Sequence, residues 1–368
     1  MKLRIDPEML KGDYIENLTA EHPDTIGVQF DPLKESIPTN IVHNLEKIRP
    51  FGGLKHEKGL SDRYEQLYED RALFRVIDSC QARCTNCYIK NQIVVPRHIM
   101  PTLEEKLVAS EEEVERVLKE VKSQPKLRNF LISGGTPFIL TAESLDYLIG
   151  EFLKISQISQ IYIAGSRPIF NPNMFRQEIV EVLTNHVRYD AELKKNKRIG
   201  VTVHINHPDE LQPEVVEGLN NFSKSGIPLF SQTILMRGVN DSEETLEKLY
   251  SNLSGIGVNP YYLLHAMPTR FAASFRTSLK RGLDLMNFLE RNSGHERPLF
   301  TVATKVGKVH LTNSTNLNYI KEEGKRYVVL KTPYKKEEFL RVTGRNSLPE
   351  TVFEREASLH VKYLDGDQ

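Results

Sequence analysis

The sequence has no excess of charge of either sign, no long apolar run and very few cysteines. Lysine and arginine together number 49, as do aspartate and glutamate, so a nucleic-acid partner would need a local basic patch. No apolar stretch approaches the roughly eighteen residues that a membrane span needs. We therefore expect neither nucleic acid nor a membrane as a partner. The strongest basic run is expected to be a solvated connector; it consists of Lys194, Lys195, Lys197 and Arg198.

All three cysteines lie close together, at Cys80, Cys84 and Cys87. An odd number of clustered cysteines cannot form a disulfide framework, and a reducing compartment would keep the thiols available as metal ligands. The N-terminus reaches acidic residues before an apolar segment can form, which is unlike a secretory signal. The sequence therefore predicts a cytoplasmic protein with a metal site.

From residue 72 onward, short β-branched or aromatic runs alternate with helical patterns. Apolar residues between Val114 and Val121 have helical spacing, and Ser110 with Glu113 resembles a capping box. Strands that alternate with helices predict a parallel sheet. We expect an α/β fold with an open, partial (β/α)6 barrel, and a closed barrel of eight units is the alternative. The predicted strands lie near residues 72–78, 129–133, 159–165, 199–205, 227–235 and 258–264.

The two ends of the chain differ in pattern from the barrel. Residues 1–70 carry proline and glycine punctuation and short helical stretches such as 40–48, which indicates an N-terminal helical cap. After Pro298 come shorter strand-like runs at 299–306, 308–311 and 327–330. The predicted domains are the cap (1–70), the barrel (71–297) and a C-terminal extension (298–368) that we expect to help complete a cofactor or substrate site.

The cysteines directly follow the first predicted strand, at the end of a β/α barrel where loops build active sites. Three thiolates on one loop can bind three irons of a [4Fe–4S] cluster and leave the fourth iron without a protein ligand. A zinc site would need a further ligand, such as a distant histidine. A redox-active pair of Cys84 and Cys87 would leave Cys80 unexplained. The CxxxCxxC spacing after a barrel strand favours the cluster.

This spacing resembles the signature of the radical S-adenosylmethionine (SAM) superfamily. The resemblance implies that SAM binds the open iron, that one electron breaks its sulfonium C–S bond, and that a 5′-deoxyadenosyl radical abstracts hydrogen from a substrate. The segment Gly134-Gly135-Thr136 resembles the superfamily motif for the methionine amino group. Ser166 and Arg167 are the predicted partners of the SAM carboxylate. Asn86 stands where the superfamily commonly has an aromatic residue.

Further segments are similar to lysine 2,3-aminomutase and its relatives, and together they span most of the chain between residues 31 and 310. The resemblance implies an isomerase that moves an amino group of an amino acid or another amine. It also implies an electron donor such as flavodoxin or ferredoxin, and a homo-oligomer. The similar segments are Asp31 to Thr39, Asp70 to Phe74, Ile132 to Gly135, Gly165 to Arg167, His204 to Pro208, Arg237 to Asp241, Pro260 to Tyr262 and Phe275 to Thr277.

In the resembled aminomutases, a lysine in a glycine-rich segment binds pyridoxal phosphate (PLP). The matching candidate is Lys308, with Lys305 in reserve. Leu264 stands at the position of a tyrosine that contacts the PLP phosphate in the family. The resemblance therefore makes PLP a candidate third cofactor. The residues predicted to lie near the cofactors are Arg71, His204 and Gln232.

The residues by which the lysine-specific enzymes hold their substrate are not kept. Two aspartates and an arginine of those enzymes correspond here to Met267, Ala303 and Ile89. A buried ammonium group without a carboxylate partner would be costly, so we expect a substrate other than free lysine. The residues available for an anionic group are Lys90, Arg97, His265 and Arg270.

Two alternatives to an aminomutase are retained. The first is a radical SAM enzyme on the same scaffold that has lost PLP and catalyses epimerisation, dehydrogenation or another hydrogen abstraction. The second is a zinc-stabilised binding protein without catalysis. Because the chain has no cysteine beyond the three, sulfur insertion and cysteine-dependent RNA methylation are not expected.

Overall fold

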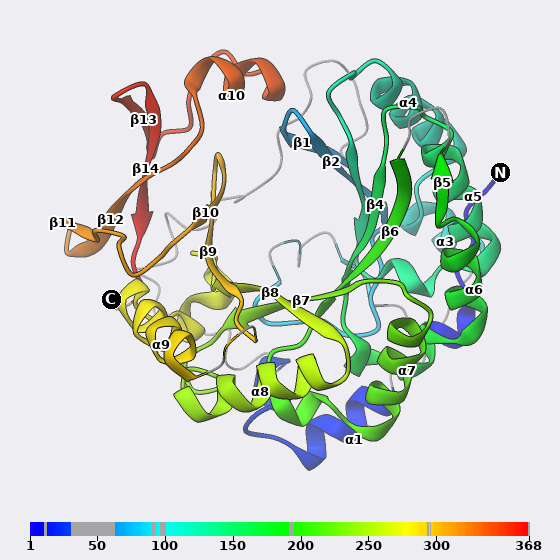
Figure 1. Cartoon of the computed structure of the whole chain (residues 1–368), viewed down its shortest axis with the longest axis horizontal. Helices are drawn as coiled ribbons and strands as arrows, with labels where there is room; N and C mark the ends of the chain where they lie inside the picture. The colour runs from blue at the N-terminus through cyan, green and yellow to red at the C-terminus, as the bar shows by residue number, and fades with distance from the viewer. Residues whose placement is uncertain are drawn as a thin grey trace.

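The computed structural model describes residues 1–10, 13–30, 63–87, 89, 93–95, 101–190, 195–292, 294 and 296–366. Its centre is a ten-stranded sheet that curls into an incomplete ring (Figure 1). The strands follow the order β1-β2-β3-β4-β6-β7-β8-β9-β10, and β5 pairs with β6 at the side. They are β1 (Tyr64–Tyr68), β2 (Arg71–Ile77), β3 (Asn129–Gly134), β4 (Gln160–Ser166), β5 (Arg188–Asp190), β6 (Lys195–His204), β7 (Leu229–Leu235), β8 (Val258–His265), β9 (Leu299–Thr304) and β10 (Gly307–His310).

All the predicted barrel strands are present, as β2, β3, β4, β6, β7 and β8, and they pair with one another in parallel. A further parallel strand, β9, pairs with β8, although the sequence places it in the C-terminal extension. The sheet ends in antiparallel strands, β1 at one edge and β10 at the other. The open, partial barrel is therefore confirmed. Because the sheet runs across both predicted boundaries, the division into three domains stays a prediction.

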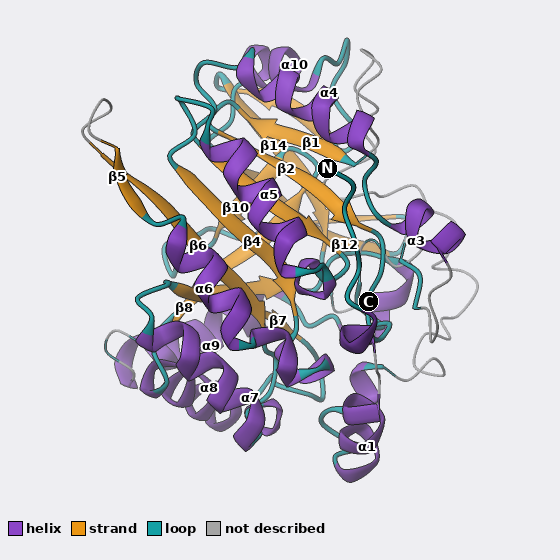
Figure 2. Cartoon of the chain, turned by 90° about the vertical axis from the view of Figure 1, so that its right-hand side faces the viewer, coloured by secondary structure: helices purple, strands orange, loops and turns teal. Residues whose placement is uncertain are grey.

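Helices cover the outer face of the ring (Figures 1 and 2). The capping box at the start of α4 is confirmed, since the Ser110 side chain accepts from the Glu113 amide and the Glu113 carboxylate accepts from the Ser110 amide. In the part of the chain that the structure describes, no helix is long and apolar enough to cross a membrane. The outer helices are α4 (Glu111–Lys122), α5 (Ala142–Leu153), α6 (Gln177–Asn185), α7 (Pro213–Lys224), α8 (Glu243–Gly255) and α9 (Leu279–Asn292).

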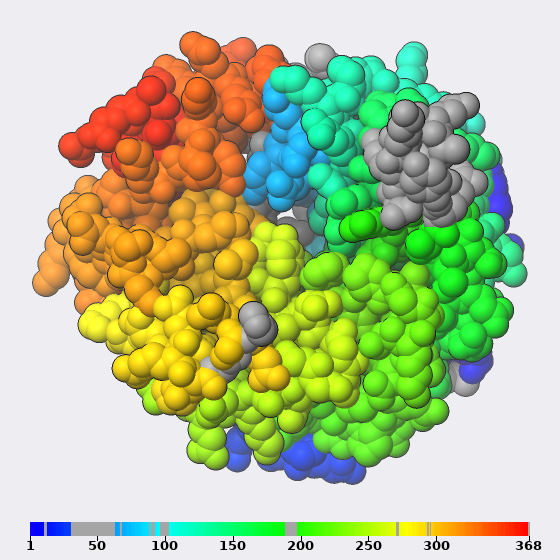
Figure 3. All heavy atoms as spheres, in the orientation of Figure 1, coloured from blue at the N-terminus to red at the C-terminus, as the bar shows by residue number. Residues whose placement is uncertain are grey.

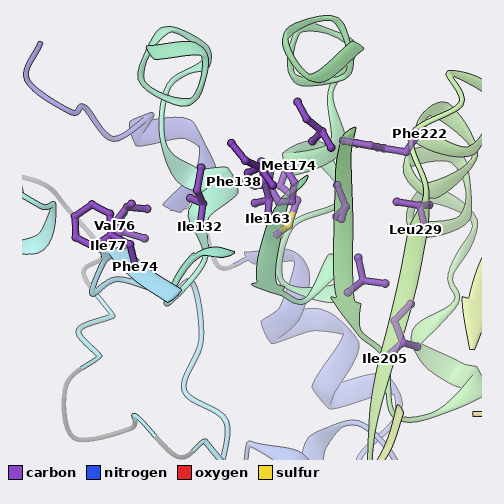
Figure 4. Packing of buried hydrophobic residues seen from close by; sticks show 14 of the residues in the cluster. Phe74, Val76, Ile77, Ile132, Phe138, Ile163, Met174, Ile205, Phe222 and Leu229 are labelled. Carbon is purple, nitrogen blue, oxygen red and sulfur yellow. The ribbon is translucent and has the colours of Figure 1, made fainter. Parts of the chain in front are cut away.

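Alternate side chains of each barrel strand face opposite sides of the sheet. On β3, Phe130 and Ile132 are fully buried in the core, whereas Leu131 and Ser133 line a cavity inside the ring. Figure 4 shows the core side, where Ile132 lies near Phe138. The apolar core therefore fills the layer between sheet and helices, and the inner face of the ring is left for a site.

The remaining elements belong mainly to the N-terminal and C-terminal parts of the chain. At the N-terminus lie η1 (Pro7–Leu10), α1 (Asp13–Glu21) and η2 (Gly27–Gln29), while the predicted helical stretch 40–48 lies outside the described residues. The short helix α3 (Pro101–Leu107) precedes α4. The C-terminal part forms a four-stranded sheet with the order β11-β12-β14-β13. Its elements are β11 (Asn318–Glu322), β12 (Lys325–Lys331), α10 (Lys336–Thr343), β13 (Val352–Arg355) and β14 (Ser358–Leu364).

Three residues of the predicted basic connector, Lys195, Lys197 and Arg198, lie in β6, and Lys197 is only 2% exposed. The prediction of a solvated connector is therefore wrong for the Lys197 side chain. Its ammonium group donates to the carbonyls of Leu153 and Ile158, over 3.1 and 2.7 Å, and to two further carbonyls between them. The last carbonyls of a helix have no partner within the helix. Lys197 therefore caps the end of α5 from the neighbouring strand.

Candidate active site

The inner face of the ring encloses a cavity of about 540 Å³. The space-filling view shows a hollow at the centre of the ring, between segments coloured blue, orange and yellow-green (Figure 3). Cys80, Cys84 and Cys87 line this cavity, and so does Lys308. The predicted cluster ligands and the predicted PLP lysine thus line the same cavity.

The three cysteines lie on the loop that follows β2. The Cys80 amide donates to the carbonyl of Val94 over 3.1 Å, and the Cys87 amide to that of Cys84 over 3.4 Å. All three thiols are free of disulfides. Burial raises the pKa of Cys87 to about 12 and also raises the pKa of Cys80. Thiolates at Cys80 and Cys87 therefore require a strongly positive partner, which the irons of a cluster supply.

Within the described residues, no group of three or more His, Cys, Asp or Glu side chains is placed to hold a single metal ion. Side chains in such a group would share one ion. A cubane cluster does not require convergence, because each thiolate binds its own iron at a separate corner.

Gly134 and Gly135 let the end of β3 pass directly against the cysteine loop. A Cβ atom on Gly134 would lie 2.1 Å from a carbonyl oxygen of β2, and one on Gly135 would lie 2.0 Å from that of Ser79. Gly134 also has a φ of +139°, which residues with a side chain rarely adopt. Both glycines line the cavity, whereas Thr136 is fully buried and its hydroxyl donates to Cys80 Sγ over 3.5 Å. The predicted SAM segment is therefore in contact with the cysteines.

The guanidinium group of Arg167 reaches the cysteine loop from the end of β4. Its Nη1 donates to Cys84 Sγ over 3.5 Å, and its Nη2 donates to Glu210 over 2.8 Å and to Gln29 over 2.9 Å. Burial lowers the pKa of Arg167, but the charges of Glu210 and Cys84 outweigh burial and the net shift is upward. The neighbouring Ser166 is fully buried, and its Oγ has no hydrogen-bond partner among the described residues.

Lys308 is held at the seam between the two edges of the open sheet. Its amide donates to the Tyr68 hydroxyl over 2.8 Å, and its carbonyl accepts from the Tyr334 hydroxyl over 2.7 Å. Its Nζ lies 4.2 Å from the centre of the Tyr262 ring. Burial, followed by the charge of Arg71, lowers the pKa of Lys308 to about 8. This environment makes the neutral, nucleophilic amine accessible near neutral pH.

Arg71, His204 and Gln232 line the same cavity. Burial and neighbouring cations lower the pKa of His204 to about 4, so its ring is neutral at physiological pH. Gln232 lies beside His204 in the register of β6 and β7. Arg71 forms an ion pair with Asp70 over 3.1 Å. The structure therefore brings these predicted cofactor residues together with Lys308, whereas Lys305 is half-buried outside the cavity lining.

His265 has a structural role instead of the predicted role in anion binding. Its Nε2 donates to the carbonyl of Thr277 and its Nδ1 accepts from the Tyr363 hydroxyl, both over 2.8 Å. Burial lowers the pKa of His265 to about 3, so the ring carries no charge to offer an anion. The other candidates, Lys90, Arg97 and the side chain of Arg270, lie outside the described residues.

Three polar residues that hold this site together, Gln29, Tyr68 and Glu210, were not among the predicted site residues. Glu210 comes soon after Pro208, where a segment similar to the aminomutases ends, and its place in the sequence could have indicated it as a site residue. Gln29 and Tyr68 had no such signal, since their partners Arg167 and Lys308 are 138 and 240 residues away in the sequence.

The family model of the radical SAM superfamily matches residues 74–249 of this chain, which include the three cysteines, Gly134, Gly135 and Arg167. The partial barrel and its cysteine loop thus define a radical SAM protein. A protein from Aquifex aeolicus (strain VF5) named "Putative L-lysine 2,3-aminomutase" is 30% identical over 286 residues, which are 76% of this chain and 71% of the relative. The chain belongs to the lysine 2,3-aminomutase family.

Two further relatives show how widely the similarity extends. The L-lysine 2,3-aminomutase of Methanococcus maripaludis is 31% identical over 236 residues, 64% of this chain but only 50% of that protein. The glutamate 2,3-aminomutase of Clostridioides difficile (strain 630) is 24% identical over 308 residues, 82% of this chain and 67% of that protein. Relatives named for different substrates therefore share this scaffold.

Proposed function

We propose that this chain is a radical SAM enzyme that moves an amino group within an amino acid or another small amine, in a reducing compartment such as the cytoplasm. The observation that supports the proposal is the single cavity lined by three cysteines and by Lys308. When bound, the cluster with SAM supplies a hydrogen-abstracting radical, and PLP supplies a carbonyl group that binds amines. The electrons would come from a donor such as flavodoxin or ferredoxin, and association into a homo-oligomer is a further prediction.

The residues of this chain divide the work between two parts of the cavity lining, the cysteine loop and strand β10. Cys80, Cys84 and Cys87 would hold the cluster. Gly135 has no side chain that would push the cysteine loop away from the end of β3. At the seam, Lys308 offers an amine whose pKa of about 8 leaves part of it unprotonated near neutral pH. This amine fits the carbonyl end of PLP, and Arg71 is the cation available to its phosphate.

The cavity lining supports a substrate without a second ammonium group. Met267, Ala303 and Ile89 all line the cavity, at the positions where the lysine-specific relatives carry charged residues. Among the described lining residues, Glu65 is the one carboxylate, and it is paired with Arg75. A distal ammonium group would therefore lose water without gaining a partner. We propose an amino acid with a neutral or acidic side chain.

A second candidate function is a radical SAM reaction without PLP. Leu264 lines the cavity at the position of the family's phosphate-binding tyrosine, and it offers no hydrogen bond to a phosphate. An epimerase or dehydrogenase on this scaffold would need the three cysteines but not the amine of Lys308.

One experiment separates the two functions. The full chain is reconstituted anaerobically with iron, sulfide, SAM and a reductant, with and without PLP, and is given a panel of deuterated amino acids. The proposed aminomutase forms 5′-deoxyadenosine and a rearranged, deuterium-labelled product only with PLP. Product formation without PLP would establish the second candidate, and the absence of SAM cleavage in every arm would refute both.

A further inference from the structure

Arg167 is enclosed so completely that its charge has a fixed position. It is 4% exposed, and its guanidinium lies 4.9 Å from the centre of the Phe30 ring and 5.6 Å from that of Phe170. The edge of the group is held by Glu210 and Gln29 on one side and by Cys84 Sγ on the other. A guanidinium group held in this way cannot swing toward a ligand elsewhere in the cavity.

The partners of Arg167 are themselves fixed by buried hydrogen bonds. The second oxygen of the Glu210 carboxylate accepts from the Gln29 side chain over 3.0 Å and from the Asn206 amide over 3.1 Å. The Gln29 carbonyl accepts from both the amide and the hydroxyl of Thr85, over 2.9 and 2.8 Å. Because Thr85 lies between Cys84 and Cys87, the same network that holds the arginine also holds the cysteine loop.

The network continues into two segments that are similar to the aminomutases. The Asn206 side chain donates to Gln29 over 2.9 Å and accepts from the Ile234 amide over 2.8 Å. Asn240 donates to the Asn206 carbonyl over 2.7 Å and to the Ile234 carbonyl over 2.8 Å. These two asparagines therefore support the cysteine loop through Gln29.

We propose that Arg167 is a positioning residue that places a permanent positive charge and an N–H donor on the Cys84 ligand, and so raises the reduction potential of the cluster. The inference rests only on the cluster part of the proposed function. Reduction adds one electron from an external donor and makes the cluster more negative, so a cation and a hydrogen bond at a ligand sulfur stabilise the reduced state. Glu210 limits this effect, because its negative charge opposes that of Arg167.

This assignment differs from the one that the sequence suggests, in which Arg167 binds the SAM carboxylate. Nη1 and Nη2 both have protein partners, Cys84 for Nη1 and Glu210 with Gln29 for Nη2. The Arg167 Nε lacks a partner among the described residues, so the alternative assignment has the SAM carboxylate accept from Nε. The two roles differ in what they predict for protein without SAM.

The test is a redox titration of the reconstituted full chain without SAM, followed by the electron paramagnetic resonance of the reduced cluster. Arg167→Gln removes the charge and is expected to lower the ratio of reduced to oxidised cluster at fixed potential about tenfold, a shift of about −59 mV for one electron. Glu210→Gln keeps an acceptor but leaves Arg167 unopposed, and its midpoint should move to a higher potential. Arg167→Lys keeps the charge and should fall between Arg167→Gln and the parent.

The matched control is Arg326→Gln, which removes another arginine paired with a fully buried carboxylate, Asp365, 2.8 Å away and outside the cavity lining. Its midpoint potential should equal that of the parent. A parental potential in Arg167→Gln, with weaker equilibrium binding of SAM, would overturn the proposal in favour of the carboxylate role. If Arg167→Gln does not assemble the cluster, Glu210→Gln decides: an unchanged or lower potential refutes the proposal. If the proposed aminomutase function fails but this inference holds, the rearranged product is missing while the midpoint potentials of the variants still shift as described.

Discussion

Two lysines are enclosed by this fold in opposite ways. Lys197, on the outer side of β6, donates to the carbonyl of Leu153, the last residue of α5, and to three carbonyls of the segment that follows the helix. Lys308, on the inner side of the ring, has no hydrogen-bond acceptor for its ammonium among the described residues, and the charge of Arg71 adds to the effect of burial on its pKa. Acceptors stabilise the charged form of an amine, whereas desolvation and a second cation favour its neutral form. The contrast separates a lysine buried for stability from one buried for reactivity.

The largest effect is expected from Lys308→Met, which removes the reactive amine. The variant should lose the PLP chromophore that borohydride fixes, and with it the rearranged product. Its free energy of unfolding should stay the same or rise, because the substitution removes a buried amine that has no acceptor. Absorbance spectra with PLP and chemical denaturation of the cofactor-free chain measure the two outcomes.

Lys305→Met is the control for this substitution. Lys305 is half-buried and lies outside the cavity lining, so its variant should keep the chromophore. The assignment of Lys308 is wrong if the chromophore disappears in Lys305→Met and survives in Lys308→Met.

Lys197→Met tests the stabilising half of the comparison. Removing the ammonium leaves buried carbonyls of residues 153 to 158 without their donor, and we expect the free energy of unfolding to fall by about 3 kcal/mol. Iron content and the PLP chromophore of the folded fraction should not change. Lys154→Met removes an exposed lysine at the end of the same helix and should cost no more than about 0.5 kcal/mol. Equal losses in the two variants would contradict the capping role.

The two lysines also show where prediction from sequence reaches its limit. The strands were predictable because their apolar runs are local, and so was the cysteine loop, since its spacing follows β2. Neither lysine could be judged locally. The acceptors of Lys197 lie 39 to 44 residues away, and the backbone of Lys308 is held by Tyr68 from 240 residues away. A charged residue in a polar stretch is usually solvated, and only the carbonyls of residues 153 to 158 beside Lys197 reverse that expectation.

The pH dependence of stability sharpens the comparison. The pKa of Lys308 is lowered from 10.5 to about 8 in the folded chain. Between these two values the unfolded state therefore binds more protons, so the contribution of Lys308 to stability rises with pH. The difference in unfolding free energy between the cofactor-free parent and Lys308→Met should shift by about 2 to 3 kcal/mol in favour of the parent from pH 8 to 10.5. A difference that does not change with pH would show that folding does not lower the pKa of Lys308.

The smallest effect is expected at the seam itself, where Tyr334 donates to the Lys308 carbonyl. Tyr334→Phe keeps the ring that packs on Gly307 but removes one buried hydrogen bond, so the free energy of unfolding should fall by about 1 kcal/mol. Because that bond fixes the backbone of the reactive lysine, PLP should bind more weakly while the chromophore still forms. Tyr327→Phe, in the C-terminal sheet and outside the cavity lining, is the control and should leave PLP affinity unchanged. Equal PLP affinity in parent and Tyr334→Phe would mean that Tyr68 alone holds Lys308 in place.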